Sequence, residues 1–171
     1  MTRYAALLRG VNVGGINIKM ADLAELFRGL GFSGVKTVLA SGNVLFESDG
    51  AAEELRGGIE TALREKFGYQ AQVHVVALDA LRAIVDGYPL QQREGWHRYV
   101  VFFLDGAPSS SLAAVCDGSA SEAAAVGDGV LYWTVERGHT LDTPFAKSLG
   151  SREFGSRTTN RNLNTLEKLL R

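Results

Sequence analysis

The stretch Val35-Lys36-Thr37-Val38-Leu39-Ala40-Ser41-Gly42-Asn43-Val44-Leu45-Phe46-Glu47 decides how the first half of the chain folds. Two β-rich runs, 35–40 and 44–47, flank the turn residues Ser41-Gly42-Asn43, a pattern typical of a β-hairpin. The spacing of apolar residues predicts a strand over 4–11 and a helix over 20–30 before this hairpin, and a helix over 52–67 and a strand over 72–78 after it. The resulting order, strand–helix–hairpin–helix–strand, is that of a ferredoxin-like βαββαβ unit.

The second half of the chain repeats this order less completely. A strand is expected over 98–104, a helix after Pro108, and a second hairpin around Gly127-Asp128-Gly129. Helices are expected over 144–149 and 163–170, so that a helix stands where the fourth strand of the repeat belongs. We therefore predict an α/β (α+β) fold of two packed ferredoxin-like, βαββαβ-type halves with C-terminal helices. One continuous mixed sheet is the alternative.

The predicted domain boundaries follow from this repeat. Residues 1–78 form the N-terminal half, residues 79–95 a connecting helix and linker, and residues 96–171 the second α/β half with the C-terminal helices. At 171 residues a folded chain buries roughly 70% of the surface that it exposes when unfolded, which is enough for a core without metal or disulfide support.

The net charge, the cysteine content and the length of the apolar runs exclude several classes of protein. The chain has 18 Lys and Arg against 19 Asp and Glu, a net charge of −1, so no global field draws it to nucleic acid or to an anionic membrane surface. The lone Cys116 excludes an internal disulfide and suits a reducing compartment. No apolar run approaches the ~20 residues of a membrane span. We expect a cytoplasmic protein that does not contact membranes.

Two polar loops are predicted to meet at one edge of the first sheet. In a βαββαβ sheet the strand order is usually 4-1-3-2, so the end of strand 1 lies beside the start of strand 3. This brings the loop at residues 9–15 next to the turn at residues 41–43, and loops on a rigid scaffold often carry binding groups. The candidate ligand-binding residues at this edge are Arg9, Asn12, Gly14, Gly15, Ser41 and Asn43.

The first loop departs from the standard phosphate-binding motifs. A Walker loop counted from Gly10 requires Lys and Ser or Thr where Ile16 and Asn17 stand, and the dinucleotide fingerprint requires glycine at Asn12. The glycines can still bring backbone N–H groups close to an anion. The alternative is that they supply positive φ in a tight connection, and that residues 41–43 form only a turn.

The polar segment at residues 156–165 supplies the remaining candidates. Thr158 or Thr159 is expected to cap the last helix, whose basic N-terminus, carrying Arg157, Arg161 and Asn162, could bind a phosphate or a carboxylate. Residues 147–171 contain six Lys and Arg against two Asp and Glu, which supports that interpretation. The alternative is a solvated helix face with an ordinary cap.

No residues form a recognisable catalytic or metal-binding constellation. His74, His97 and His139 lie far apart in sequence and form no HxH or HExxH arrangement, so no metal site is expected. Cys116 follows a small apolar run and is expected in the core. No cofactor is predicted, and an enzymatic role is disfavoured because no nucleophile or base stands out.

Three segments together carry a resemblance to a known family. They are Leu7-Leu8-Arg9-Gly10-Val11-Asn12-Val13-Gly14-Gly15, then Ser41-Gly42-Asn43-Val44-Leu45-Phe46, then Thr159-Asn160-Arg161-Asn162-Leu163-Asn164-Thr165. In this order and at these distances, over nearly the whole chain, the sequence resembles the bacterial domain-of-unknown-function family 1697. The resemblance implies ferredoxin-like halves and no established activity, so it supplies no catalytic residues.

We therefore predict a binding module for an anionic small molecule or nucleotide at the edge formed by the loop at 9–15 and the turn at 41–43. Three alternatives remain: an enzyme of unknown reaction in the same pocket, nucleic-acid contact through the basic C-terminal segment, and assembly through a sheet edge. The sequence sets neither the oligomeric state nor whether the C-terminal segment joins the N-terminal loops.

Overall fold

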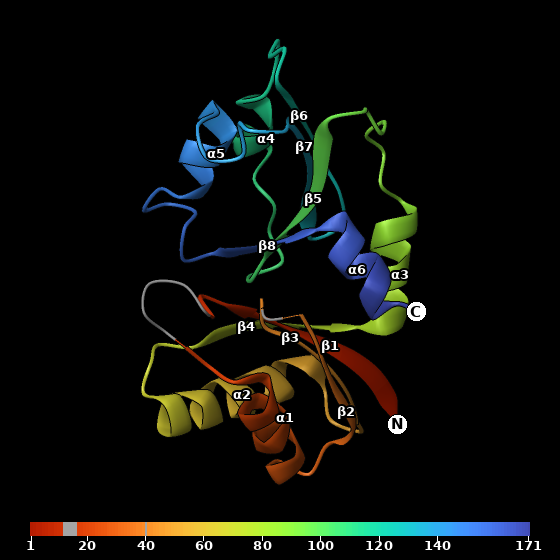
Figure 1. The fold of residues 1–171 in the computed structure, drawn as a ribbon, viewed down its shortest axis with the longest axis vertical. Coiled ribbons are helices and arrows are strands. Elements are labelled where there is room, and N and C mark those ends of the chain that lie inside the picture. The colour runs from red at the N-terminus through yellow and green to blue at the C-terminus, as the bar shows by residue number, and fades with distance from the viewer. Residues whose placement is uncertain (12–16, 40) are drawn as a thin grey trace. The chain divides into compact units, whose positions relative to one another are not determined.

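The computed structural model describes residues 1–11, 17–39 and 41–171, and its backbone divides into two compact units (Figure 1). Unit 1 comprises Met1–Arg82 and Lys168–Arg171, and unit 2 comprises Ala83–Glu167. Each unit contains a four-stranded antiparallel sheet. Compactness alone does not show that a piece of chain folds independently. The domain boundaries given above therefore stay a prediction.

Unit 1 has the predicted ferredoxin-like order. Its elements are β1 (Thr2–Arg9), α1 (Met20–Gly29), β2 (Ser33–Val38), β3 (Asn43–Ser48), α2 (Ala52–Phe67) and β4 (Gln72–Ala77). The strands lie in the order β2-β3-β1-β4, which is the predicted 4-1-3-2 arrangement read from the other side. Helix α3 (Leu78–Asp86) follows β4 directly and crosses into unit 2.

The core of unit 1 lies between α1, α2 and one face of the sheet. Leu55, Ile59 and Leu63 of α2 are buried at i, i+4 and i+8, the spacing that places side chains on one face of a helix. They share one cluster with Phe27 of α1 and Phe46 of β3. The periodicity that predicted these helices therefore also determines which helix faces are covered.

Unit 2 has the same strand arrangement. Its elements are β5 (Trp96–Phe103), α4 (Ser110–Ala114), β6 (Glu122–Val126), β7 (Val130–Glu136), α5 (Pro144–Leu149), β8 (Thr158–Asn162) and most of α6 (Leu163–Leu169). The sheet order is β6-β7-β5-β8, with every neighbouring pair antiparallel. The two ferredoxin-like halves predicted from the sequence are confirmed.

The expectation that a helix replaces the fourth strand of the second half was wrong. Residues 158–162 form β8, which pairs with β5 from Tyr99↔Asn162 to Phe103↔Thr158. Thr158 and Thr159 consequently lie in a strand and do not cap the last helix. The polar sequence lacks apolar alternation, but the backbone of β5 supplies the hydrogen-bonding partner that makes it a strand, because strand formation depends strongly on context.

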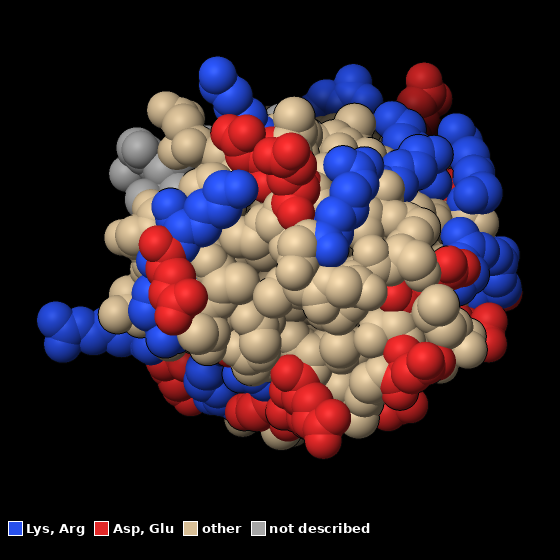
Figure 2. Space-filling view, turned by 90° about the horizontal axis from the view of Figure 1, so that it is seen from below, with Lys and Arg blue, Asp and Glu red and all other residues tan. Residues whose placement is uncertain are grey.

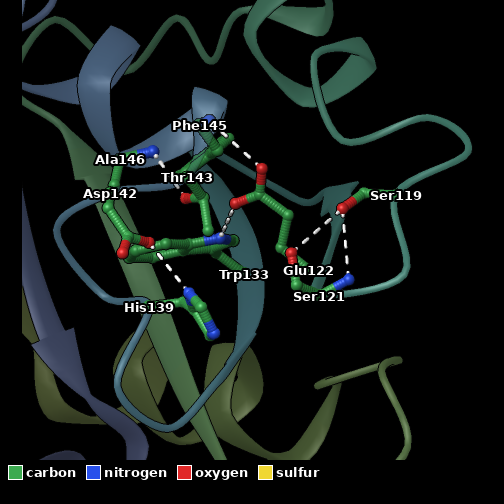
Figure 3. A network of polar contacts seen from close by, with 9 residues as sticks. All are labelled: Ser119, Ser121, Glu122, Trp133, His139, Asp142, Thr143, Phe145 and Ala146. Atoms are coloured by element: carbon green, nitrogen blue, oxygen red, sulfur yellow. Dashed lines mark hydrogen bonds and ion pairs between the residues drawn. The ribbon is translucent and has the colours of Figure 1, made fainter.

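A buried carboxylate fixes α5 to the sheet of unit 2 (Figure 3). Glu122, at the start of β6, is only 2% exposed. Its Oε1 accepts from Trp133 Nε1 at 3.1 Å and its Oε2 accepts from the backbone N–H of Phe145 at 3.2 Å. The Trp133 ring in turn packs against Phe145, with centroids 4.8 Å apart. Both carboxylate oxygens thus have a donor, as a buried ionisable group requires.

Candidate functional site

At one edge of unit 1, the end of β1 and Val11 lie beside the turn at residues 41–43. Strand β1 pairs with β3 up to Leu7↔Asn43, and the N–H of Leu8 donates to the carbonyl of Gly42 at 2.8 Å. Gly42 has φ +87°, and a Cβ added to it would lie 3.0 Å from Cβ of Leu8 and 3.2 Å from Cβ of Val11. Glycine is therefore required at this turn both for its backbone conformation and for the close approach of the neighbouring strand.

Asn43 has a structural role at this edge. Its side chain is fully buried, and Nδ2 donates to the carbonyl of Val38 and to Oγ of Ser41, both at 2.9 Å. These bonds span the hairpin turn between β2 and β3. The Asn43 amide and the Ser41 hydroxyl therefore stabilise the turn itself.

The remaining candidates of the first loop are only partly covered by the structure. Arg9 is the last residue of β1, is half-buried, and lies opposite Gln72 of β4. Asn12, Gly14 and Gly15 lie outside the described residues.

The C-terminal candidates lie in or beside β8, in unit 2, and do not form a helix N-terminus as expected. Arg157 makes an exposed ion pair with Asp105 at 3.4 Å and lies over the ring of Phe154. Arg161 is only 7% exposed, and its Nη1 donates at 2.8 Å to Oγ1 of Thr159 and to the carbonyl of Asn160. Burial lowers the pKa of Arg161 to about 10, so the guanidinium stays charged at neutral pH.

Asn162 differs from the other C-terminal candidates because it lines an open pocket. The pocket lies within unit 2 and has a volume of about 450 Å³. We call it the arginine-lined pocket. Its basic side chains are Arg93, His97, Arg98 and Arg137; its amides and hydroxyl are Gln92, Asn162, Asn164 and Thr165; and Glu94, Gly95 and Trp96 complete the lining.

Strand register brings these residues together from three separate segments. Trp96 of β5 lies opposite Glu136 of β7, and the N–H of Arg137 donates to the carbonyl of Gly95 at 2.8 Å. On the other side of β5, Tyr99 lies opposite Asn162 of β8. The start of β5 therefore lies between the ends of β7 and β8. Residues at the start of β5 and just before it, and residues at or just after the ends of β7 and β8, line one recess.

The three arginines of the pocket carry charge without acidic partners. Within the described part of the chain, none of them makes an ion pair. Arg93 lies over the ring of Trp96, 4.7 Å from its centroid, and Arg98 lies over the ring of Tyr88 at 5.6 Å. Stacking on an aromatic face orients a guanidinium and leaves its in-plane N–H donors available, a geometry suited to carboxylate or phosphate.

Of the residues around this pocket, only Asn162 is among the ligand-binding candidates predicted from the sequence. His97 was considered only as a metal ligand. The available signal was the repeat itself: if the second half follows the order of the first, the start of its first strand lies beside the end of its third. Applied to Arg93, Arg98 and Arg137, that rule predicts a basic cluster.

A second face of the molecule carries side chains of both charge signs. Figure 2 shows the side of the molecule on which α1 and α2 lie in Figure 1, where basic and acidic side chains are interspersed. On α2, Arg56 approaches Glu53 at 4.0 Å and Glu60 at 3.6 Å, as residues three and four apart on a helix do. The basic side chain of Arg56 on this face therefore has acidic neighbours.

Cys116 belongs to the core of unit 2 and is 5% exposed. Burial, with smaller effects of Glu122 and Asp117, raises the pKa of its thiol to about 12. A thiol with this pKa is protonated at neutral pH and is a poor nucleophile. Among residues 1–11, 17–39 and 41–171, no cluster of three His, Cys, Asp or Glu side chains could hold a metal ion, and no helix is long and apolar enough to cross a membrane.

Known proteins resemble this chain in sequence and in fold. The model of a family described as "Protein of unknown function (DUF1697)" matches residues 1–132. The conserved bacterial protein SP0830 from Streptococcus pneumoniae has a similar structure, with a TM-score of 0.80 and 24% identity over 98% of this chain and 96% of that chain. At this identity the likeness shows the fold alone. No curated protein is significantly similar in sequence.

Proposed function

The chain belongs to the DUF1697 family, whose function is unknown, and we propose that it binds an anionic small molecule or nucleotide in the arginine-lined pocket of unit 2. One observation carries this proposal. Arg93, Arg98 and Arg137 line one recess in which Glu94 is the single acidic residue among the described residues. The volume of about 450 Å³ lies within the range of small-molecule sites, about 300–1,000 Å³.

Binding is favoured over catalysis because the pocket lining contains few groups that could transfer a proton or act as a nucleophile. His97 and Glu94 are the titratable groups there besides the arginines, and the buried thiol of Cys116 belongs to the core. An enzyme of unknown reaction in this pocket is the alternative. It requires a proton-transfer step that changes when His97 or Glu94 is replaced.

A second location for the ligand is the edge of unit 1 at which Arg9 precedes the first loop. The observation that favours it is the hydrogen bond from Leu8, near the end of β1, to the turn residue Gly42. Nucleic-acid contact through the C-terminal segment has weaker support, because Arg161 is buried and Arg157 is paired with Asp105.

The test is a thermal-shift screen of anionic metabolites on the full chain, followed by titration calorimetry of every ligand found. Arg137→Ala is expected to weaken binding about tenfold, because charge-assisted hydrogen bonds to an anion are the strong ones. Arg152→Ala, which removes an exposed arginine of unit 2 outside the pocket, is the matched control and is expected to leave affinity unchanged.

Two results decide against this location. Equal affinity of the wild type, Arg98→Ala and Arg137→Ala for every ligand found excludes the pocket as the site. If Arg9→Ala then removes binding, the ligand is held at the edge of unit 1.

A further inference from the structure

The charge of the arginine-lined pocket matches a particular class of anion. Three arginines against the single carboxylate of Glu94 give the Arg and Glu side chains of the described lining two net positive charges. A phosphate monoester carries about −1.5 to −2 at pH 7 and presents three acceptor oxygens. Guanidinium groups bind such oxygens with paired, planar donors. A monocarboxylate would leave one of these charges uncompensated.

The rest of the lining indicates what the phosphate is attached to. Gln92, Asn162, Asn164 and Thr165 supply side-chain amides and a hydroxyl, which both donate and accept hydrogen bonds. The Oδ1 of Asn162 already accepts from the N–H of Asn164 at 2.9 Å, which fixes the orientation of that amide at the pocket wall. Groups of this kind satisfy the hydroxyls of a polyol better than they cover an apolar or aromatic moiety.

The aromatic part of the lining is already engaged. Among the described residues of the lining, Trp96 supplies the one indole or phenyl ring, and the guanidinium of Arg93 lies over that ring, 4.7 Å from its centroid. A nucleobase is commonly held by stacking on such a face. The position of Arg93 therefore disfavours a nucleotide and places this guanidinium where it can meet the phosphate.

We infer that the ligand of this pocket is a phosphate monoester of a small hydroxyl-rich compound, such as a sugar phosphate. Arg93, Arg98 and Arg137 bind the phosphate, while Asn164 and Thr165 bind hydroxyl groups. The inference rests on the proposed function, because it names the ligand class of the same pocket. It goes further because it specifies a phosphate and not a carboxylate, attached to a hydroxyl-rich group and not to a nucleoside.

The experiment is titration calorimetry of the full chain at pH 7.5 with glucose 6-phosphate, inorganic phosphate, glucose, AMP and citrate. Glucose 6-phosphate is expected to bind at least tenfold more tightly than each of the other four probes. Arg137→Ala is expected to weaken glucose 6-phosphate and inorganic phosphate alike. Asn164→Ala is expected to weaken glucose 6-phosphate about fivefold and to leave inorganic phosphate unchanged. Arg152→Ala is the control, and circular dichroism of each variant confirms that it folds.

Tighter binding of citrate, AMP or inorganic phosphate than of glucose 6-phosphate overturns the inference. If Arg137→Ala weakens the binding of that tighter probe, the proposed function stands and only the choice of ligand class is overturned. If none of the four anionic probes binds, both are overturned. An equal loss of glucose 6-phosphate and inorganic phosphate in Asn164→Ala also overturns the inference, because the body of the ligand then makes no contact of its own.

Discussion

Removing the buried carboxylate of Glu122 tests whether the network around α5 holds unit 2 together. Glu122→Ala deletes the acceptors of two donors, the indole N–H of Trp133 and the backbone N–H of Phe145 (Figure 3). Both donors are buried with it.

The magnitude follows from the two donors. A buried donor left without a partner costs about 1–3 kcal/mol, so two such donors cost roughly 4 kcal/mol in total. Glu122→Gln keeps one acceptor oxygen but turns an N–H toward the second donor, and about 2 kcal/mol is expected. Small proteins are stable by about 5–15 kcal/mol, so Glu122→Ala removes a large fraction of the stability of the folded chain.

Urea unfolding followed by tryptophan fluorescence is the appropriate assay. The two tryptophans of the chain, Trp96 and Trp133, both lie in unit 2, so the signal reports this unit. Glu153→Ala, which removes an exposed carboxylate of the same unit, is the matched control and is expected to change the free energy of unfolding by less than about 0.5 kcal/mol.

A double-mutant cycle isolates the bond to the indole. Trp133→Phe removes Nε1, so its combination with Glu122→Ala is expected to give a coupling energy of about 1–2 kcal/mol. The reasoning is refuted if Glu122→Ala unfolds within 1 kcal/mol of the wild type, or if the coupling energy is zero.

Two further predictions concern single residues. Gly42→Ala is expected to destabilise the chain by about 2 kcal/mol, because it forces a Cβ into a left-handed backbone and to within 3.0 Å of Leu8. Gly57→Ala, in α2 with open space around it, is expected to stabilise the chain by about 0.5–1 kcal/mol. Equal melting temperatures of the two variants would contradict both expectations. For Cys116, the unfolded thiol ionises near pH 9 whereas the folded thiol keeps its proton up to about pH 12. The unfolded state is therefore favoured as pH rises through this window. The free energy of unfolding of the wild type should fall by about 1.4 kcal/mol more than that of Cys116→Ala between pH 8 and pH 10. Parallel pH profiles of the two proteins, measured by urea unfolding, would contradict this prediction.

Much of unit 1 could be predicted because its signals are local. The turn at residues 41–43 and the helical stripe through Leu55, Ile59 and Leu63 are read from neighbouring residues alone. The strand order then follows from the topology of the βαββαβ unit. That order places the end of β1 beside the start of β3, where the N–H of Leu8 donates to the carbonyl of Gly42.

Strand β8 could not be predicted in the same way. Its residues, Thr158 to Asn162, alternate no apolar side chains and include two asparagines, which are depleted in strands. Pairing with β5 overrides this weak local preference. The same override changed the roles of Arg161 and Asn162, one becoming a buried side chain and the other part of a pocket wall.

The sequence by itself determined the two α/β repeats and the turn at residues 41–43, because periodicity and turn chemistry act over a few residues. Only the tertiary structure decided that Arg93, Arg137 and Asn162 surround one recess. They come from segments far apart in the chain, and the hydrogen-bond register of β5 with β7 and β8 brings them together. Long-range backbone pairing of that kind is absent from any short stretch of sequence.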